Sequence, residues 1–156
     1  MRIAAPKRVS RSYTQSLQGP PEAVFPLLCP VREAEWLEYW DPLMVASSSG
    51  VAEEDCVFIT PSKAESTFWY VTRYEPKSGF IEFVRFTPGL TACRLSIQVA
   101  KAAEGARARI TYAHTSIGEQ GDAFVDGFTE TAFTGFMQDW EKRMNHYLTT
   151  GACLRS

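Results

Sequence analysis

The sequence predicts an α+β fold in which a seven-stranded antiparallel sheet curves around one long C-terminal helix, with two short helices after the first strand. Two observations predict this arrangement. Between residues 43 and 116, short β-rich pieces alternate with turn residues, the pattern of an antiparallel meander. Residues 121–150 carry apolar side chains at three- and four-residue steps, the pattern of an amphipathic helix. The chain of 156 residues is the length of one domain, 1–156, with a core of about 9–150.

The first predicted strand, Val9–Gln18, alternates larger side chains with a row of Ser and Thr. Gly19-Pro20-Pro21 ends it, and proline at a first helical position opens the segment that follows. We expect one short helix over Pro21–Leu28 and a second over Val31–Tyr39, after Pro30. Trp36 is assigned to packing between helices.

Six further strands complete the sheet: Leu43–Ala46, Cys56–Thr60, Thr67–Tyr74, Phe80–Phe86, Leu90–Ala100 and Arg107–Ser116. Two have clear faces. Cys93, Leu95, Ile97 and Val99 share one face of their strand, as Ala108, Ile110, Tyr112 and His114 do of theirs. A slip of one residue would expose every apolar side chain, so these registers are well specified. The strands over 67–74 and 80–86 carry aromatics on both faces and cannot be sided.

The final helix has a stripe made of Val125, Phe128, Ala132, Phe136, Trp140, Met144 and Tyr147. Asp122 can cap its start, and Gly151 can take a left-handed conformation past its end. Because each four-residue step slips by about 40° at 3.6 residues per turn, the stripe slants around the helix. A slanting aromatic stripe suits a curved partner surface.

Composition narrows the classes of function. A net charge of −2 gives no electrostatic case for nucleic acid or an anionic membrane, and Lys7, Arg8 and Arg11 indicate a solvated end. No apolar run approaches the ~20 residues of a membrane span, so no integral membrane association is expected. The basic start lacks the apolar stretch of a secretory signal. Four scattered cysteines indicate reduced thiols in a cytoplasmic protein. The sequence leaves a homodimer open.

Metal and nucleophile sites are not indicated. His114 and His146 fall on different elements, and neither has a second ligand at the required spacing. No nucleophile elbow and no phosphate-cradling glycine loop is present. We therefore expect no metal and no cofactor.

The order of elements, with Pro21-Glu22-Ala23-Val24-Phe25, Trp36 and the closing segment Asp122–Thr149, resembles the START-related, birch-pollen-allergen-like (SRPBCC) superfamily, in particular its polyketide cyclase/aromatase-like branch. The resemblance covers roughly Val9 to Thr150. It implies the helix-grip fold, in which the curled sheet and the long helix enclose a ligand cavity. The family has no shared catalytic set, so the resemblance assigns no catalytic residue.

Aromatic walls with a few placed polar groups are typical of small-molecule sites. On this basis we expect the cavity to be lined by Trp40, Phe58, Trp69, Tyr70, Phe83, Arg85, Leu95, Ile97, Ile110, Tyr112, His114, Phe128, Ala132 and Phe136. Each of them also fits a plain core. Arg85 would anchor a carboxylate or enolate if it faces inward, but the sequence favours an outward Arg85 paired with a carboxylate such as Glu82.

Three functions fit this reading. The first is binding of a small hydrophobic or amphipathic ligand. The second is a cyclase/aromatase- or dehydratase-like enzyme, with Tyr112 and His114 as candidate proton-transfer groups. The third is a protein-interaction module similar to Hsp90-activator-like domains. Because Gly127 and Gly135 weaken a helix by about 1 kcal/mol each relative to Ala, we also expect the N-terminal half of the long helix to act as a gate.

Overall fold

The computed structural model describes residues 1, 3–62 and 65–155. The strands are β1 (Arg8–Leu17), β2 (Met44–Ala46), β3 (Val57–Thr60), β4 (Thr67–Glu75), β5 (Phe80–Thr87), β6 (Thr91–Lys101) and β7 (Ala106–Ser116). They form one antiparallel sheet in the order β1-β7-β6-β5-β4-β3-β2. The predicted seven-stranded antiparallel sheet is confirmed: β2 to β7 follow one another as a meander, and β1 pairs with β7.

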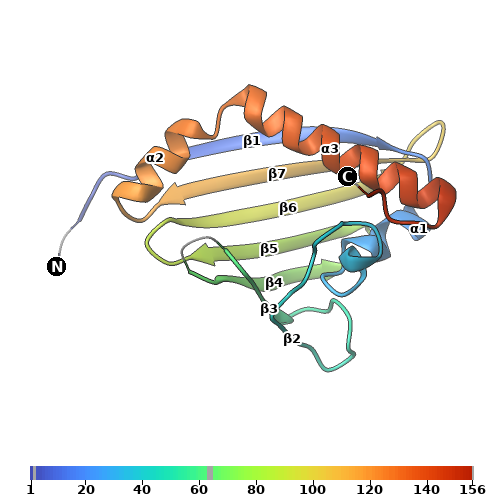
Figure 1. Ribbon diagram of the computed structural model, residues 1–156, viewed down its shortest axis with the longest axis horizontal. Helices are drawn as coiled ribbons and strands as arrows, with labels where there is room; N and C mark the ends of the chain where they lie inside the picture. Colours follow the sequence, from blue (N-terminus) through green and yellow to red (C-terminus); the bar gives the residue numbers. More distant parts are fainter. Residues whose placement is uncertain (2, 63–64, 156) are drawn as a thin grey trace.

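The helices lie on the concave face and at one end of the sheet (Figure 1). They are α1 (Pro21–Val24), the 3₁₀ helices η1 (Phe25–Leu28) and η2 (Arg32–Glu35), α2 (Glu119–Gly127) and α3 (Glu130–Thr150). α3 packs along β1, α2 packs on β7, and the chain between η2 and β2 passes in front of β4 and β5. None of the helices in the described part of the chain is long and apolar enough to cross a membrane.

The predicted faces of β6 and β7 are confirmed. Leu95 and Ile97 on β6 and Ile110 and Tyr112 on β7 are buried, whereas Arg94 and Arg109 point outward. Residues that pair directly across the sheet share a face, and Leu95 pairs with both Tyr112 and Phe83. These three side chains therefore lie on the same, inner face.

The same pairing gives β4 and β5 the faces that the sequence left open. Phe83 lies inward, and so Arg85, two residues further, lies inward beside its cross-strand partner Trp69. Tyr70 and Phe86 lie on the outer face and are more than 40% exposed.

The long C-terminal helix is interrupted, which corrects the expectation of one continuous helix. α2 ends at Gly127, and Phe128 has φ −79° and ψ 61°, so that Thr129 N–H donates to the carbonyl of Gly127 over 2.9 Å. This is an inverse γ-turn. Thr129 then caps α3, since its hydroxyl accepts from the backbone N–H of Ala132 at 3.2 Å.

Arg11 of β1 holds this break. Its Nε donates to the carbonyl of Phe128 over 3.2 Å, and its Nη1 lies 3.1 Å from a carboxylate oxygen of Glu130. One side chain therefore binds both the end of α2 and the start of α3. The other predicted weak point, Gly135, lies inside an unbroken α3.

The break changes which side chains of α3 face the sheet. The buried face consists of Phe133, Met137, Trp140 and Met144. Trp140 and Met144 were in the predicted stripe, whereas Ala132 is exposed and Phe136 is 50% exposed. A fresh start at Thr129 rotates α3 relative to α2, so one continuous stripe cannot describe both helices.

The second short helix is also shorter than expected. A 3₁₀ turn over Arg32–Glu35 replaces the helix predicted over Val31–Tyr39, and Tyr39 has a left-handed φ of 65°. Trp36 is fully buried, donates to the carbonyl of Leu27 over 3.0 Å and packs on Trp140 at 5.3 Å between ring centroids. Its predicted packing role between helices is confirmed.

These contacts fill one end of the space beneath α3. α3 is further fastened to β1 by Gln15, whose amide donates to the carbonyl of Met137 over 3.0 Å, and by Asn145, whose amide donates to the carbonyl of Ser16 over 2.9 Å. The other end of the concave face remains hollow.

Candidate ligand cavity

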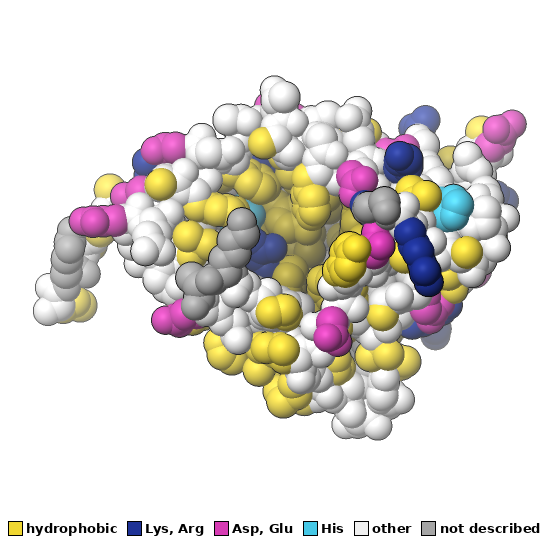
Figure 2. All heavy atoms as spheres, viewed as in Figure 1, with side chains coloured by type: hydrophobic (Ala, Val, Ile, Leu, Met, Phe, Trp, Pro, Cys, Tyr) yellow, Lys and Arg dark blue, Asp and Glu magenta, His cyan; other side chains and the backbone are white. Residues whose placement is uncertain are grey.

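A cavity of about 270 Å³ opens on the concave face between α3 and the chain after η2. Figure 2 shows this hollow, with mostly hydrophobic walls and a basic side chain inside it. Nine of the residues expected from the sequence line it: Trp40, Phe58, Trp69, Phe83, Arg85, Leu95, Ile97, Tyr112 and Phe136. We call it the main cavity.

Four aromatic side chains form one wall. Phe58 stacks on Trp69 with ring centroids 5.1 Å apart and an interplanar angle of 11°. Phe83 meets both of these rings edge-on, at 6.1 and 6.2 Å, and Trp40 meets Phe58 at 6.4 Å. Offset and edge-on contacts of this kind hold aromatic rings in defined positions.

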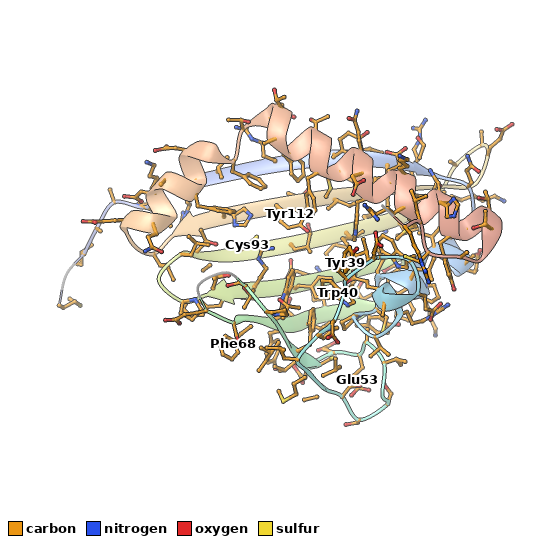
Figure 3. The ribbon with its side chains drawn as sticks, viewed as in Figure 1. Tyr39, Trp40, Glu53, Phe68, Cys93 and Tyr112 are labelled. Atoms are coloured by element: carbon orange, nitrogen blue, oxygen red, sulfur yellow. The ribbon has the colours of Figure 1, made fainter. Side chains whose placement is uncertain are left out.

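Hydrogen bonds orient the two indoles of this wall. Trp40 donates to the carbonyl of Pro30 over 2.7 Å, and Trp69 donates to the hydroxyl of Thr60 over 2.9 Å. Figure 3 shows Tyr39 and Trp40 on the segment that crosses in front of the sheet, with Tyr112 on β7 behind them. The walls therefore come from the sheet, from α3 and from this segment.

A second hollow of about 540 Å³ adjoins the first and shares Tyr39, Trp40, Trp69 and Arg85 with it. Its other lining residues are Asp41, Thr60, Pro61, Ser62, Thr67, Thr87, Pro88, Leu90 and Gln120. We call it the side chamber. It is more polar than the main cavity, and Arg85 lies where the two meet.

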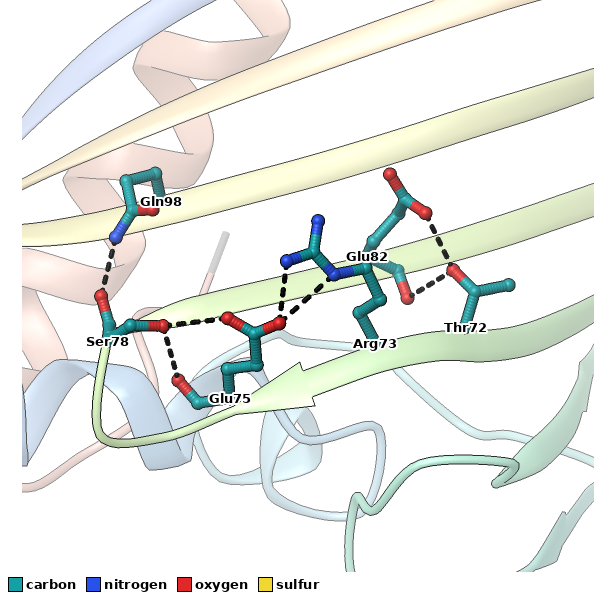
Figure 4. Close-up of polar contacts among 6 residues, drawn as sticks. All are labelled: Thr72, Arg73, Glu75, Ser78, Glu82 and Gln98. Atoms are coloured by element: carbon teal, nitrogen blue, oxygen red, sulfur yellow. Dashed lines mark hydrogen bonds and ion pairs between the residues drawn. The ribbon is translucent and has the colours of Figure 1, made fainter.

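The inward position of Arg85 corrects the expectation that it would pair with Glu82 on the outer face. The hydroxyl of Thr72 instead donates to Glu82, at 2.9 Å to the carboxylate and 3.2 Å to the carbonyl (Figure 4). The Arg85 guanidinium carbon lies 5.1 Å from the centroid of Trp69. Its Nε is buried without a hydrogen-bond partner.

Glu33, which the sequence did not single out, also lines the main cavity. Burial raises the pKa of its carboxyl well above the ordinary value, because the charged form is desolvated. Across residues 1, 3–62 and 65–155 no hydrogen bond or ion pair of this carboxyl is found. A neutral carboxyl facing an apolar cavity can donate a proton or a hydrogen bond.

Tyr112 lines the main cavity. Burial raises the pKa of its phenol strongly, with the charge of Arg85 acting in the opposite direction. The phenol is therefore neutral at ordinary pH and serves as a hydrogen-bond group rather than as a base.

His114 lies next to Tyr112 but does not line the main cavity. Its ring contacts Phe124 at 4.9 Å, Phe128 at 4.7 Å and Tyr112 at 5.9 Å between centroids. Burial, then the charge of Arg85, lowers the pKa of His114 to about 4, and burial raises the pKa of the neighbouring Cys93 thiol to about 11. The 3.7 Å contact between Cys93 Sγ and His114 Nε2 therefore joins two neutral groups.

Four other expected lining residues also lie elsewhere. Tyr70 points outward and donates to Asp55 over 2.6 Å. Ile110 is buried against its neighbours, Phe128 packs on Tyr112 and His114, and Ala132 is exposed on α3. Tyr70 lies outside the cavity because it is on the outer face of β4, and Ala132 does so because the break in the helix rotates α3.

The lining residues that sequence reasoning missed are Leu28, Pro30, Glu33, Leu37, Glu38, Tyr39, Asp139 and Trp140. Most of them belong to the segment 28–40. Its irregular backbone has no period that could mark an inward face. Among the described residues, no three His, Cys, Asp or Glu side chains converge as metal ligands would.

The outer face of the sheet carries an exposed apolar patch. It consists of Met44, Phe68, Tyr70, Val84 and Phe86, each 40–46% exposed. Phe68 pairs with Phe86, and Tyr70 pairs with Val84, across β4 and β5. We call this the outer apolar patch.

No protein-family model and no curated protein sequence matches the chain. Solved structures do. A protein of unknown function from Staphylococcus aureus aligns with TM-score 0.69 and 10% identity over 94% of this chain and 96% of that one. Norcoclaurine synthase from Thalictrum flavum, in complex with a transition-state analogue, aligns with TM-score 0.61 and 8% identity over 96% and 100%.

The protein Ara h 8.0201 aligns with TM-score 0.61 and 11% identity over 92% of this chain and 97% of that one. At these identities the likeness concerns the fold alone. The chain therefore has the helix-grip fold of the Bet v1-like proteins, in which a curved seven-stranded sheet is closed by a long C-terminal helix.

Proposed function

We propose that this protein binds a small hydrophobic or amphipathic molecule between its curved sheet and α3. The observation that carries the proposal is the main cavity itself. Its walls are aromatic and aliphatic, and its few polar groups come from Glu33, Glu38, Arg85, Tyr112 and Asp139. This composition is typical of small-molecule sites.

The apolar walls can supply the affinity. A two-ring aromatic molecule that removes about 250 Å² of apolar surface from water gains about 6 kcal/mol at about 25 cal/mol per Å². Association and ordering costs reduce this figure. A ligand of this size should therefore bind in the micromolar to millimolar range from apolar burial alone, and polar contacts inside the cavity should improve on that.

The test is native mass spectrometry of the protein isolated from its own host, with identification of any retained compound. Leu95→Trp fills the main cavity from β6 and should abolish retention. Val84→Trp adds the same side chain to the outer face of β5 and serves as the matched control. If Leu95→Trp retains the compound as well as Val84→Trp does, the cavity is not the site.

A cyclase- or dehydratase-like enzyme is the second candidate, and Glu33 favours it. A desolvated carboxyl with a raised pKa is suited to general acid catalysis. Glu33 would act with the phenol of Tyr112, whereas His114 stands behind the cavity wall. Norcoclaurine synthase shows that an enzyme can have this fold. Loss of turnover with unchanged ligand uptake in Glu33→Gln and Tyr112→Phe would support the enzyme.

The outer apolar patch supports the third candidate, a protein-interaction module. The interior argues for a ligand first, because an interaction module of this kind needs no internal space. Phe86→Glu on the patch should leave ligand retention unchanged. If it removes a co-purifying protein instead, the interaction role gains support.

A further inference from the structure

We propose that the ligand carries a carboxylate, which pairs with Arg85 at the junction of the main cavity and the side chamber. This inference rests on the proposed ligand-binding function and narrows it to one class, apolar molecules with a single anionic group. It follows from the position of Arg85, the charges around it and the shape of the two hollows.

Arg85 is an internal cation without a counter-ion. In the described ranges its guanidinium makes no ion pair within 4.0 Å, while Lys7, Arg11, Arg32 and Arg73 each have one. Its contact with the face of Trp69 offsets part of the cost of burial, but its Nε has no acceptor. Its positive charge also acts to lower the pKa values of Cys93, Tyr112 and His114.

The nearby carboxyl groups do not neutralise it. Glu38 and Asp139, which also line the main cavity, both interact with Arg143 on α3, at 3.9 and 2.7 Å. Glu33 shares the main cavity with Arg85, but no ion pair within 4.0 Å joins these two residues. Asp41, exposed on the side chamber, makes no ion pair with Arg85.

The geometry favours a carboxylate over a more diffuse anion. A guanidinium presents parallel N–H donors that match the two oxygens of a carboxylate, and such a pair forms short, charge-assisted hydrogen bonds. Because Arg85 lines both hollows, the carboxylate would lie at their junction. The apolar body would then extend into the main cavity against Phe83, Leu95 and Ile97.

The inference predicts a charge preference that calorimetry can measure. The probes are 2-naphthoate and its neutral analogue 2-naphthamide, which have the same rings and nearly the same size. Wild-type protein should bind naphthoate at least about tenfold more tightly, as expected for a charge-assisted hydrogen-bonded pair. Trp40, Trp69 and Trp140 all line the main cavity, so the tryptophan fluorescence of the protein supplies a second signal for the same titration.

Two variants assign the preference to this residue. Arg85→Gln should abolish the preference while leaving naphthamide affinity within about twofold, and Arg85→Lys should retain part of it. The outward Arg94→Gln, on the neighbouring strand β6, is the control and should behave as wild type.

Equal affinity for the two probes, or a preference that survives Arg85→Gln, overturns the inference but leaves the proposed cavity function intact. Binding of neither probe, with tryptophan fluorescence that does not change, overturns both.

Discussion

The aromatic surroundings of His114 predict a specific acid sensitivity. The imidazole is 1% exposed and enclosed by Phe124, Phe128 and Tyr112, and its Nδ1 has no partner. Protonating it in the fold would bury an uncompensated charge. Its pKa is therefore lowered from 6.5 to about 4, by burial first and by the charge of Arg85 second.

The direction and the size of the change in stability with pH follow from the linkage between proton binding and folding. Because the folded pKa is the lower one, the unfolded chain binds a proton more readily between these two values, so stability falls as pH decreases through this window. The full shift corresponds to about 3 kcal/mol, of which about 2.5 kcal/mol should be lost between about pH 7 and about pH 4.5. This is a large part of the 5–15 kcal/mol that typically stabilises a domain.

His114→Phe isolates this contribution. The free energies of unfolding of both proteins are measured by denaturant titration at the two pH values, and the difference of differences cancels the carboxyl groups that they share. The variant should lose about 2.5 kcal/mol less than wild type on acidification. His146→Gln removes the chain's other histidine and is the control for the loss of an imidazole.

Equal acid losses in wild type and His114→Phe would refute the reasoning. That result would mean that the folded protein accommodates the imidazolium, and His114 would again be a candidate proton carrier at neutral pH.

Three further predictions follow from the cavity and the helix break. Arg85→Met should raise the free energy of unfolding of the ligand-free protein by about 1 kcal/mol. The substitution removes a buried N–H donor that has no acceptor, and this gain outweighs the loss of the contact with Trp69. A lower denaturation midpoint would contradict this. Burial raises the pKa of Glu33 above its ordinary 4.5, so stability should fall as pH rises above that value, and Glu33→Gln should flatten this part of a pH series of unfolding curves. Hydrogen exchange should be faster in α2 than over residues 140–147, and Arg11→Ala should accelerate it in α2 alone; uniform exchange along both helices would exclude the gate.

Sequence patterning predicted the sheet because its period is strict. Once Leu95 is inward, alternation and pairing place every neighbour on β5 and β7, and most of the predicted cavity wall follows from those strands. The sequence did not show which side chains face inward only in the two strands that have aromatic residues on both faces. For this reason the sequence favoured an outward Arg85 and an inward Tyr70, whereas the pairing of β5 with β6 and with β4 places each on the opposite face.

The helix break was harder to predict because Phe128 fits two roles. In a continuous helix it extends the apolar stripe. In the structure it occupies the turn itself and packs on Tyr112, while its carbonyl is bound by Arg11, a residue far away in sequence. Thr129 was a local signal for a helix start, but a threonine inside an otherwise periodic run is a weak one. In the segment 28–40 the sequence predicted a short helix where the chain forms a 3₁₀ turn and an irregular stretch, and so Glu33 and Tyr39 were missed.

The break also helps to explain why a cavity remains between the helices and the sheet. Beyond it, α3 directs Phe133 and Met137 toward the sheet and Trp140 toward Trp36, which fills the space near the short helices. Before it, α2 directs Phe124 onto His114 over β7. α3 packs along β1 and α2 along β7, rather than on β4 and β5. The main cavity therefore lies over β4 and β5, where Arg85 has no ion pair within the described part of the protein and can bind an anionic ligand.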